Sequence, residues 1–294
     1  MLHLRKTDGL DYGHCQYGTS RLIFRGPKRT LNPDAVAFIG GSETFGAFVE
    51  RPFPDVVQSL LSRPAVNLGC MNAGLGAFEE DETVIEAASS MRAVVLQAPD
   101  PANMTTAFWR VHPRRNDRFV EALPPLRELF PTIDFTDFTF VRHMIARLAA
   151  TDADAFATVA SEVAHDWVDR VGALSRRIAA PVTVLWVRPA DDADRPLSVT
   201  EDMMDRLSQN GLAVVVATPS DAVRARARAG MVYGPSEAAA AAALPGPAYH
   251  AEIALTVTEA IAPYVAPMGR RRSRTPSMLA PGARRQDAGD RAAG

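Results

Sequence analysis

Short, almost entirely apolar runs recur along this chain and are separated by more polar segments. Each run is four to seven residues long and is rich in valine, leucine, isoleucine and alanine. This pattern is typical of strands that are buried on both faces, as in a parallel sheet. The runs lie at residues 35–39, 65–68, 93–97, 181–187 and 212–217.

The segments between these runs show a different spacing, in which apolar residues recur every three or four positions. In the segment 152–179, for example, Phe156, Val159 and Val163 begin a stripe that continues to Ile178. Such a stripe predicts an amphipathic helix with one face on the core. Further helices are predicted at 52–62, 79–90, 200–209 and 251–264.

The alternation of strands and helices predicts the fold class. Strand–loop–helix units favour a parallel sheet with right-handed crossovers. We therefore predict an α/β protein with a flavodoxin-like three-layer α/β/α sandwich around a five-stranded parallel sheet. Residues 35–266 would form this domain, residues 1–34 an N-terminal arm with a short edge strand at 21–25, and residues 267–294 a disordered basic tail rich in Arg, Pro, Gly and Ala.

Composition excludes several classes of protein. The 294 residues carry a net charge of −2, so no overall positive charge attracts nucleic acid. Cys15 and Cys70 are too few for a disulfide framework, and no run approaches membrane-spanning length. The aspartates at 191, 192 and 194 do not have the spacing of a metal-binding loop. We expect a cytoplasmic protein with no cofactor and no metal, and its oligomeric state stays open.

The first candidate for chemistry is the turn after the first strand, Gly40-Gly41-Ser42-Glu43-Thr44-Phe45-Gly46. It places the Ser42 hydroxyl at the carboxyl end of a sheet, where open α/β sheets bind ligands. The glycines permit a sharp turn and leave backbone N–H groups able to face a developing oxyanion. Alternatively, Ser42 serves as an ordinary helix N-cap.

Two further polar loops are expected at the same edge of the sheet. The second strand runs into a glycine-punctuated loop that contains Gly69, Asn72 and Gly74, and the third strand leads to Asn103. Because parallel strands end at the same edge, these loops should lie beside Ser42.

These blocks resemble the ordered blocks of SGNH (GDSL-type) hydrolases across about residues 35–265. The resemblance implies that Ser42 is the nucleophile and that its own N–H, a glycine N–H (Gly74 or Gly69) and the Asn103 amide form the oxyanion hole. It also implies that His250, just before the last helix, is the base. Glu43, Thr44 and Asn72 would contact the substrate, a small-molecule or glycan ester.

The chain departs from that family at the triad acid, because Pro247 stands where the family has Asp. A substitute carboxylate such as Asp134 or Asp137, a Ser–His dyad, or an inactive site are the alternatives. Loss of the orienting acid alone costs about 10⁴ in rate in a serine protease.

The most polar segment is Val-His-Pro-Arg-Arg-Asn-Asp-Arg-Phe at 111–119, and the chain resembles a bacterial family that shares it. Its arginines, Arg114, Arg115 and Arg118, suit bidentate contact with carboxylate, phosphate or sulfate. Folded over the sheet edge, they would favour an acidic substrate. The alternative is a solvated loop in which Asn116 caps a helix that runs to about Phe130.

Two functions therefore remain in view. The first is a serine hydrolase or acyltransferase acting on an acyl or acetyl ester of an acidic or carbohydrate substrate. The second is a catalytically inactive or transferase-like protein that binds an anionic ligand between the Gly40–Gly46 turn and the Arg114–Arg118 cluster. No membrane partner is expected, and a nucleic-acid partner is disfavoured.

Overall fold

A computed structural model describes residues 9–191 and 195–266 of the chain. The predicted basic tail, the first residues of the arm, and Asp192 and Asp194 of the aspartate-rich loop lie outside the described residues.

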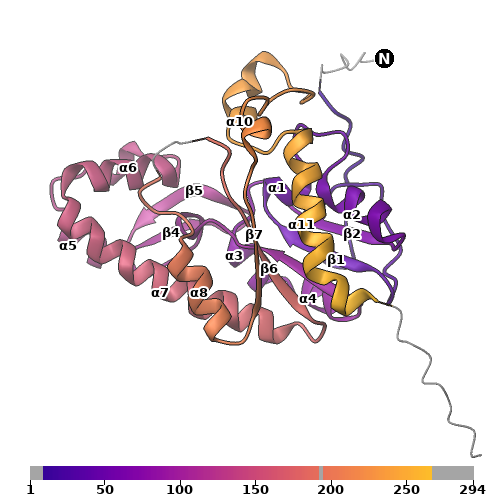
Figure 1. Ribbon diagram of the computed structural model, residues 1–294. Coiled ribbons are helices and arrows are strands. Elements are labelled where there is room, and N and C mark those ends of the chain that lie inside the picture. Colours follow the sequence, from indigo (N-terminus) through magenta and orange to yellow (C-terminus); the bar gives the residue numbers. More distant parts are fainter. Residues whose placement is uncertain (1–8, 192–194, 267–294) are drawn as a thin grey trace, which may run out of the picture.

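The sheet has five parallel strands, as predicted, and their order is β2-β1-β3-β6-β7 (Figure 1). The chain therefore passes from β1 outward to β2 and then returns to the other side of β1, which makes the gap between β1 and β3 the topological switch point. Ile39 of β1 is level with Leu68 of β2 and Leu96 of β3. The strands are β1 (Val36–Gly40), β2 (Ala65–Gly69), β3 (Ala93–Gln97), β6 (Val182–Val187) and β7 (Ala213–Ala217).

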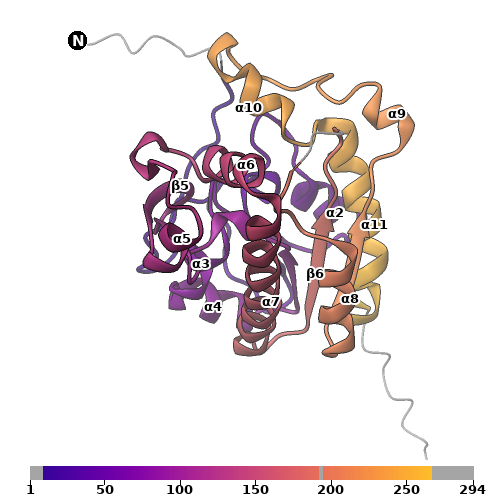
Figure 2. The same ribbon diagram turned by 90° about the vertical axis from the view of Figure 1, so that its left-hand side faces the viewer.

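Helices cover both faces of the sheet, which confirms the three-layer sandwich (Figures 1 and 2). Successive strand residues point to opposite faces, so Val36 and Phe38 join one core cluster while Ala37 and Ile39 join the other. The first cluster packs beneath α2 (Phe53–Leu61) and α11 (Pro247–Val265). The second packs beneath α3 (Leu75–Glu79), α4 (Glu82–Ser89), α7 (Ala153–Arg177) and α8 (Glu201–Gln209).

The polar segment 111–119 is not a loop but part of a hairpin, which corrects one of the sequence expectations. Strand β4 (Trp109–His112) pairs antiparallel with β5 (Arg115–Ala122). Asn116 lies within β5 and caps no helix, because its backbone N–H donates to Asn72 O, far away in the sequence. The hairpin continues into α5 (Pro124–Leu129), η2 (Phe135–Asp137) and α6 (Val141–Thr151), which form a lobe at the left of Figure 1.

The two ends of the described chain differ from the sequence expectations. Residues 21–25 form no strand; Phe24 makes isolated bridges with Cys15 and Cys70 instead. Near the other end, α9 (Asp221–Arg224), η3 (Pro235–Glu237) and α10 (Ala238–Ala242) precede the final helix. That helix, α11, begins at Pro247, so His250 lies in its first turn and not in a loop.

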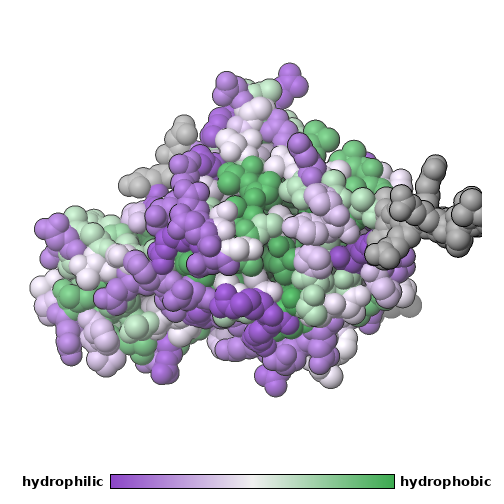
Figure 3. Space-filling view, turned by 60° about the horizontal axis from the view of Figure 1, so that its bottom comes forward, coloured by the Kyte–Doolittle hydropathy of each residue, from purple (hydrophilic) through white to green (hydrophobic). Residues whose placement is uncertain are grey.

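The molecular surface carries both hydrophobic and polar residues. Figure 3 shows a narrow central band of hydrophobic residues bordered by polar ones on the face that it brings forward. Within the described part of the chain, no helix has both the length and the apolar character needed to cross a membrane.

Candidate functional site

A cavity of about 510 Å³ opens at the carboxyl end of the sheet. It collects side chains that follow four parallel strands, β1, β2, β3 and β6, and it therefore lies where the strand order predicts a ligand site. Residues 97–100 and Asn103 line it at and after the end of β3, residues 186–191 line it at and after the end of β6, and residues 242–245 before α11 close it. Its polar lining includes Ser42, Glu43, Asn72, Asp100, Asn103 and Asp117.

The Ser42 turn is held in place by Gln97, the last residue of β3. Gln97 Oε1 accepts hydrogen bonds from Gly41 N (3.1 Å), Thr44 N (3.2 Å) and Thr44 Oγ1 (2.6 Å), and its Nε2 donates to Glu43 Oε2 (2.9 Å). A Cβ at Gly40 would lie 2.2 Å from Thr44 Oγ1, so this close approach requires glycine. Thr44 is 1% exposed and does not line the cavity, so the structure assigns it to the scaffold and not to substrate contact.

Ser42 begins the short helix α1 (Ser42–Phe45) and lines the cavity. Its Oγ accepts a hydrogen bond from Asn72 N at 3.1 Å. Among the described residues, no acceptor pairs with the Ser42 hydroxyl proton or with the Ser42 N–H. Both remain able to interact with a ligand, and Asn72 lies beside Ser42 as the sequence predicts.

Neither glycine N–H of the second block is free to hold an oxyanion. Gly69 N donates to Asn67 Oδ1 at 2.8 Å, and Gly74 N donates to Asn116 Oδ1 at 2.6 Å. Neither glycine lines the cavity. Gly74 serves close packing, since a Cβ there would lie 2.1 Å from Asn103 O. The oxyanion role predicted for Gly69 or Gly74 is therefore wrong in this structure.

Asn103 lies in the cavity wall, as expected for the third block. It ends the 3₁₀ turn η1 (Pro101–Asn103), whose first residue follows Asp100, and Asp100 Oδ1 caps the turn by accepting Ala102 N at 2.9 Å. Within the described residues the Asn103 side-chain amide has no hydrogen-bond partner, so it is available to a ligand.

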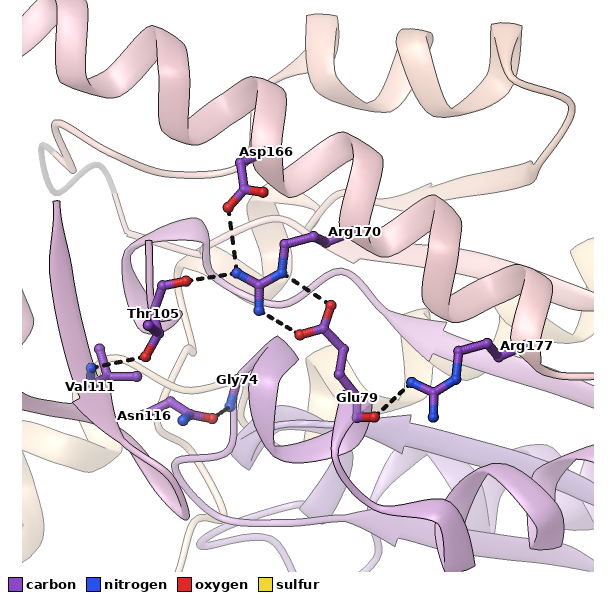
Figure 4. A network of polar contacts seen from close by, with 8 residues as sticks. All are labelled: Gly74, Glu79, Thr105, Val111, Asn116, Asp166, Arg170 and Arg177. Carbon is purple, nitrogen blue, oxygen red and sulfur yellow. Dashed lines mark hydrogen bonds and ion pairs between the residues drawn. The ribbon is translucent and has the colours of Figure 1, made fainter. Parts of the chain in front are cut away.

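A polar network ties the segment after Asn103 to α7 (Figure 4). Arg170 donates to both carboxylate oxygens of Glu79, at 3.1 and 2.5 Å, and to Thr105 O at 2.7 Å. Arg177 also donates to Glu79 O, at 2.6 Å. The segment after Asn103 is thereby anchored to the longest helix of the described chain.

Among the ionisable groups that line the cavity, Asp100 has the pKa that departs furthest from its ordinary value. Desolvation by the surrounding protein, assisted by the nearby Glu43 charge, raises the pKa of Asp100 to about 6, while the Ala102 N–H and Arg195 oppose the shift. The residue is nevertheless exposed at the cavity surface. A carboxyl with this pKa changes charge close to neutral pH.

The structure does not bring His250 to Ser42. The His250 side chain is completely buried, stacks on the Phe53 ring and does not line the cavity. Its Nδ1 accepts Phe53 N at 3.0 Å, and its Nε2 has no partner. Burial, and secondarily the positive charge of Arg25, lowers the pKa of His250 to about 3. The predicted Ser42–His250 dyad is therefore absent here, and no histidine of the described residues lines the cavity.

The predicted arginine cluster lies elsewhere as well. Arg114, Arg115 and Arg118 line a separate groove and do not enter the Ser42 cavity. The single anion site expected between them and the Gly40–Gly46 turn is consequently not formed. Asp134 and Asp137 also lie outside the cavity, both exposed near η2, so neither replaces the missing triad acid.

Three other arginines line the cavity instead: Arg188, Arg195 and Arg224. Arg188 stacks on Trp186, with 4.5 Å between its Cζ and the ring centroid, and pairs with Glu201. Among the described residues, no group of three or more His, Cys, Asp or Glu side chains could hold a metal ion. The cavity is thus a polar site built from carboxylates, amides, a hydroxyl and guanidinium groups.

Comparison with known proteins decides the family. Residues 1–265 match the family described as "Domain of unknown function (DUF6473)". The chain belongs to the DUF6473 family. No curated protein matches it. The DUF6473 match spans the arm, the sheet and α11 together.

Two solved structures are similar to this DUF6473 chain. One is a protein of the G-D-S-L family from Desulfitobacterium hafniense DCB-2, with 12% identity and a TM-score of 0.39 over 78% of this chain and 99% of that one. The other is a two-domain esterase (CEX) active on acetylated mannans, with 12% identity and a TM-score of 0.38 over 79% of this chain and 49% of that one. At these values neither likeness bears on the chemistry of the site.

Sequence reasoning missed several cavity residues. The sequence pattern places Gln97 at the end of an apolar strand and assigns no role to Asp100 or Arg188. The available signal was their position, because each is at or just after the carboxyl end of a parallel strand. Arg224, in α9, gave no such signal.

Proposed function

We propose that the cavity is the active site of a serine hydrolase or acyltransferase that acts on an ester, with Ser42 as the nucleophile. The observation that carries this proposal is that the Ser42 hydroxyl and the free Asn103 amide line one cavity at the switch point of the sheet. The Ser42 N–H and the Asn103 amide would donate hydrogen bonds to the oxyanion. His250 is not part of this proposal, because it is buried away from the cavity.

Asp100 is the proposed base. At a pH above about 6 it is ionised and can accept the Ser42 proton as Oγ attacks the ester carbonyl carbon. The protonated Asp100 then returns that proton to the departing alcohol oxygen, which leaves an acyl group on Ser42. Asp100 next deprotonates a water molecule or an acceptor alcohol, which attacks the acyl group and releases the product, and Ser42 recovers its proton.

The lining supports a polar substrate. Arg188, Arg195 and Arg224 add cationic groups to a cavity that already contains amides and carboxylates. Guanidinium groups suit carboxylate, phosphate and sulfate, and also donate to hydroxyl oxygens. We therefore propose an acyl or acetyl ester of an acidic or carbohydrate alcohol as substrate.

A fluorophosphonate probe tests the nucleophile. We expect covalent labelling of the full-length protein, loss of labelling in Ser42→Ala, and retention in Ser161→Ala, which changes an exposed serine on α7. Labelling that persists in Ser42→Ala, or a folded wild-type protein that never reacts between pH 6 and 9, would contradict the proposal.

A second candidate function is ligand binding without turnover in the same cavity. The specific observation in its favour is that no histidine of the described residues lines the cavity. Saturable binding of an acidic or carbohydrate ester, together with no labelling and no hydrolysis, would favour this alternative.

A further inference from the structure

A second concavity, the basic groove, lies between the N-terminal arm and the β4–β5 hairpin. Its volume is about 670 Å³, and its cationic lining is Arg21, Arg114, Arg115 and Arg118. His14 and His112 add imidazoles. Asn72 borders both the groove and the Ser42 cavity, so the two sites are neighbours but are built from different side chains.

The arginines of the basic groove have carboxylates in their surroundings but form no close ion pair with them. The charges of Arg118 and Arg115 act on Asp117, and Arg21 and Arg114 line a neighbouring hollow together with acidic residues 80–82. Among the described residues, none of the four has an ion-pair partner. Arg110, on the same hairpin but outside the groove, pairs with Glu121 at 3.0 Å. The four guanidinium groups have no ion-pair partners and repel one another across the groove. A bound anion would reduce this repulsion.

Local contacts fix part of this cationic lining. The Arg118 guanidinium stacks over the Phe140 ring, with 4.4 Å between Cζ and the centroid. The backbone N–H groups of Arg114 and Arg115 donate to His112 Nδ1, at 3.2 and 3.3 Å.

The same groove also exposes apolar side chains. Ile23 is 43% exposed, Met71 36% and Val120 54%, and all three line the groove. Scattered exposed hydrophobic residues need no explanation, but three beside four unpaired arginines in one hollow suit a ligand that is both apolar and anionic.

We propose that the basic groove binds a small molecule in which a phosphate, sulfate or carboxylate group is attached to an apolar body. The guanidinium groups of Arg114, Arg115 and Arg21 bind the anionic head, and Ile23, Met71 and Val120 contact the apolar part. The site uses neither Ser42 nor Asp100. The binding proposal is therefore tested independently of the proposed hydrolase activity.

Calorimetric titration of the full-length protein with octyl phosphate tests the site. We expect octyl phosphate to bind at least tenfold more tightly than inorganic phosphate or octyl glucoside, each of which supplies half of the ligand. Octyl sulfate and octanoate identify the preferred head group. Because charge contributes, affinity should fall as salt rises.

Variants locate the binding. Arg115→Gln and Arg21→Gln should each weaken octyl phosphate at least fivefold, and Val120→Ser should weaken octyl phosphate but leave inorganic phosphate unchanged. The matched control, Arg110→Gln, removes a charge from the same hairpin outside the groove and should have no effect. Equal affinity in Arg110→Gln and Arg115→Gln, or no preference for octyl phosphate over octyl glucoside, would overturn the proposal.

Discussion

Ser42 and His250 were expected to share a proton, and the structure places them in opposite environments. Ser42 lines a polar cavity, and its hydroxyl proton has no partner among the described residues. His250 is fully buried between α11 and α2, where its Nδ1 holds the first N–H of α2. The first residue lines an open cavity, whereas the second stabilises the packing of two helices.

The difference teaches that a short motif predicts a residue's place along the chain but not its contact with solvent. The turn after β1 keeps Ser42 at the sheet edge because Gln97 and the glycines fix it locally. The position of the His250 side chain instead depends on the residue at which α11 begins. Since the helix starts at Pro247, the first turn carries His250 against Phe53 and away from the cavity.

Removing the His250 side chain should give the largest loss of stability. His250→Ala leaves the buried Phe53 N–H without an acceptor and opens a void beside the Phe53 ring. We expect the free energy of unfolding to fall by about 2–4 kcal/mol, measured by urea denaturation. An unchanged midpoint would mean that His250 is not packed as described.

The buried imidazole should also make stability depend on pH. Because its pKa is about 3 when folded and about 6.5 when unfolded, the unfolded chain binds one more proton between these values. Stability should therefore fall with acidification, approaching about 1.4 kcal/mol per pH unit below pH 6 and totalling about 1.6 kcal/mol from pH 6.5 to 5.

His250→Asn provides the comparison, because it removes the titrating group. Its stability should decline less steeply over that range than the stability of the wild type. Asp100, with its raised pKa, contributes with the opposite sign between about pH 4 and 6, but it is common to both proteins. Parallel pH profiles would contradict a neutral buried His250.

A smaller effect is expected in the polar network around Arg170. Arg170→Ala removes the paired hydrogen bonds to Glu79 and the bond to Thr105 O in a partly buried place. We expect a loss of about 1–2 kcal/mol in chemical denaturation. Arg206→Ala, which breaks a 4.0 Å pair with an exposed aspartate, should change stability by less than about 0.5 kcal/mol. Equal losses of stability in the two variants would show that the network in Figure 4 contributes no more than an exposed ion pair does.

The smallest predicted change concerns Glu43. Its negative charge raises the pKa of Asp100, so Glu43→Gln should lower that pKa. If Asp100 acts as the base, the acidic limb of the rate–pH profile should move to lower pH by less than one unit. Fluorophosphonate inactivation rates measured from pH 4.5 to 8 provide the check, and a limb displaced to higher pH would contradict the assignment.

The sequence predicted the scaffold well because its strands are buried runs whose identity depends on local composition. All five strands, Ser42 at the sheet edge and Asn103 beside it were expected and are found. The hairpin at 109–122 was not, because Asn116 is fixed by distant contacts with Asn72 and Gly74. The N–H groups of Gly69 and Gly74 were likewise assigned to a ligand, although nearby amide side chains already bind them.

The most direct test of the central claim compares Asp100→Asn with His250→Asn in their rates of inactivation by a fluorophosphonate at pH 8. Asp134→Asn, an exposed carboxylate outside the cavity, is the matched control. Loss of a general base should slow Asp100→Asn by about 10²–10⁴-fold, while His250→Asn and Asp134→Asn, measured where both are folded, should react at close to the wild-type rate. A folded His250→Asn that no longer reacts, beside an Asp100→Asn that does, would contradict the account.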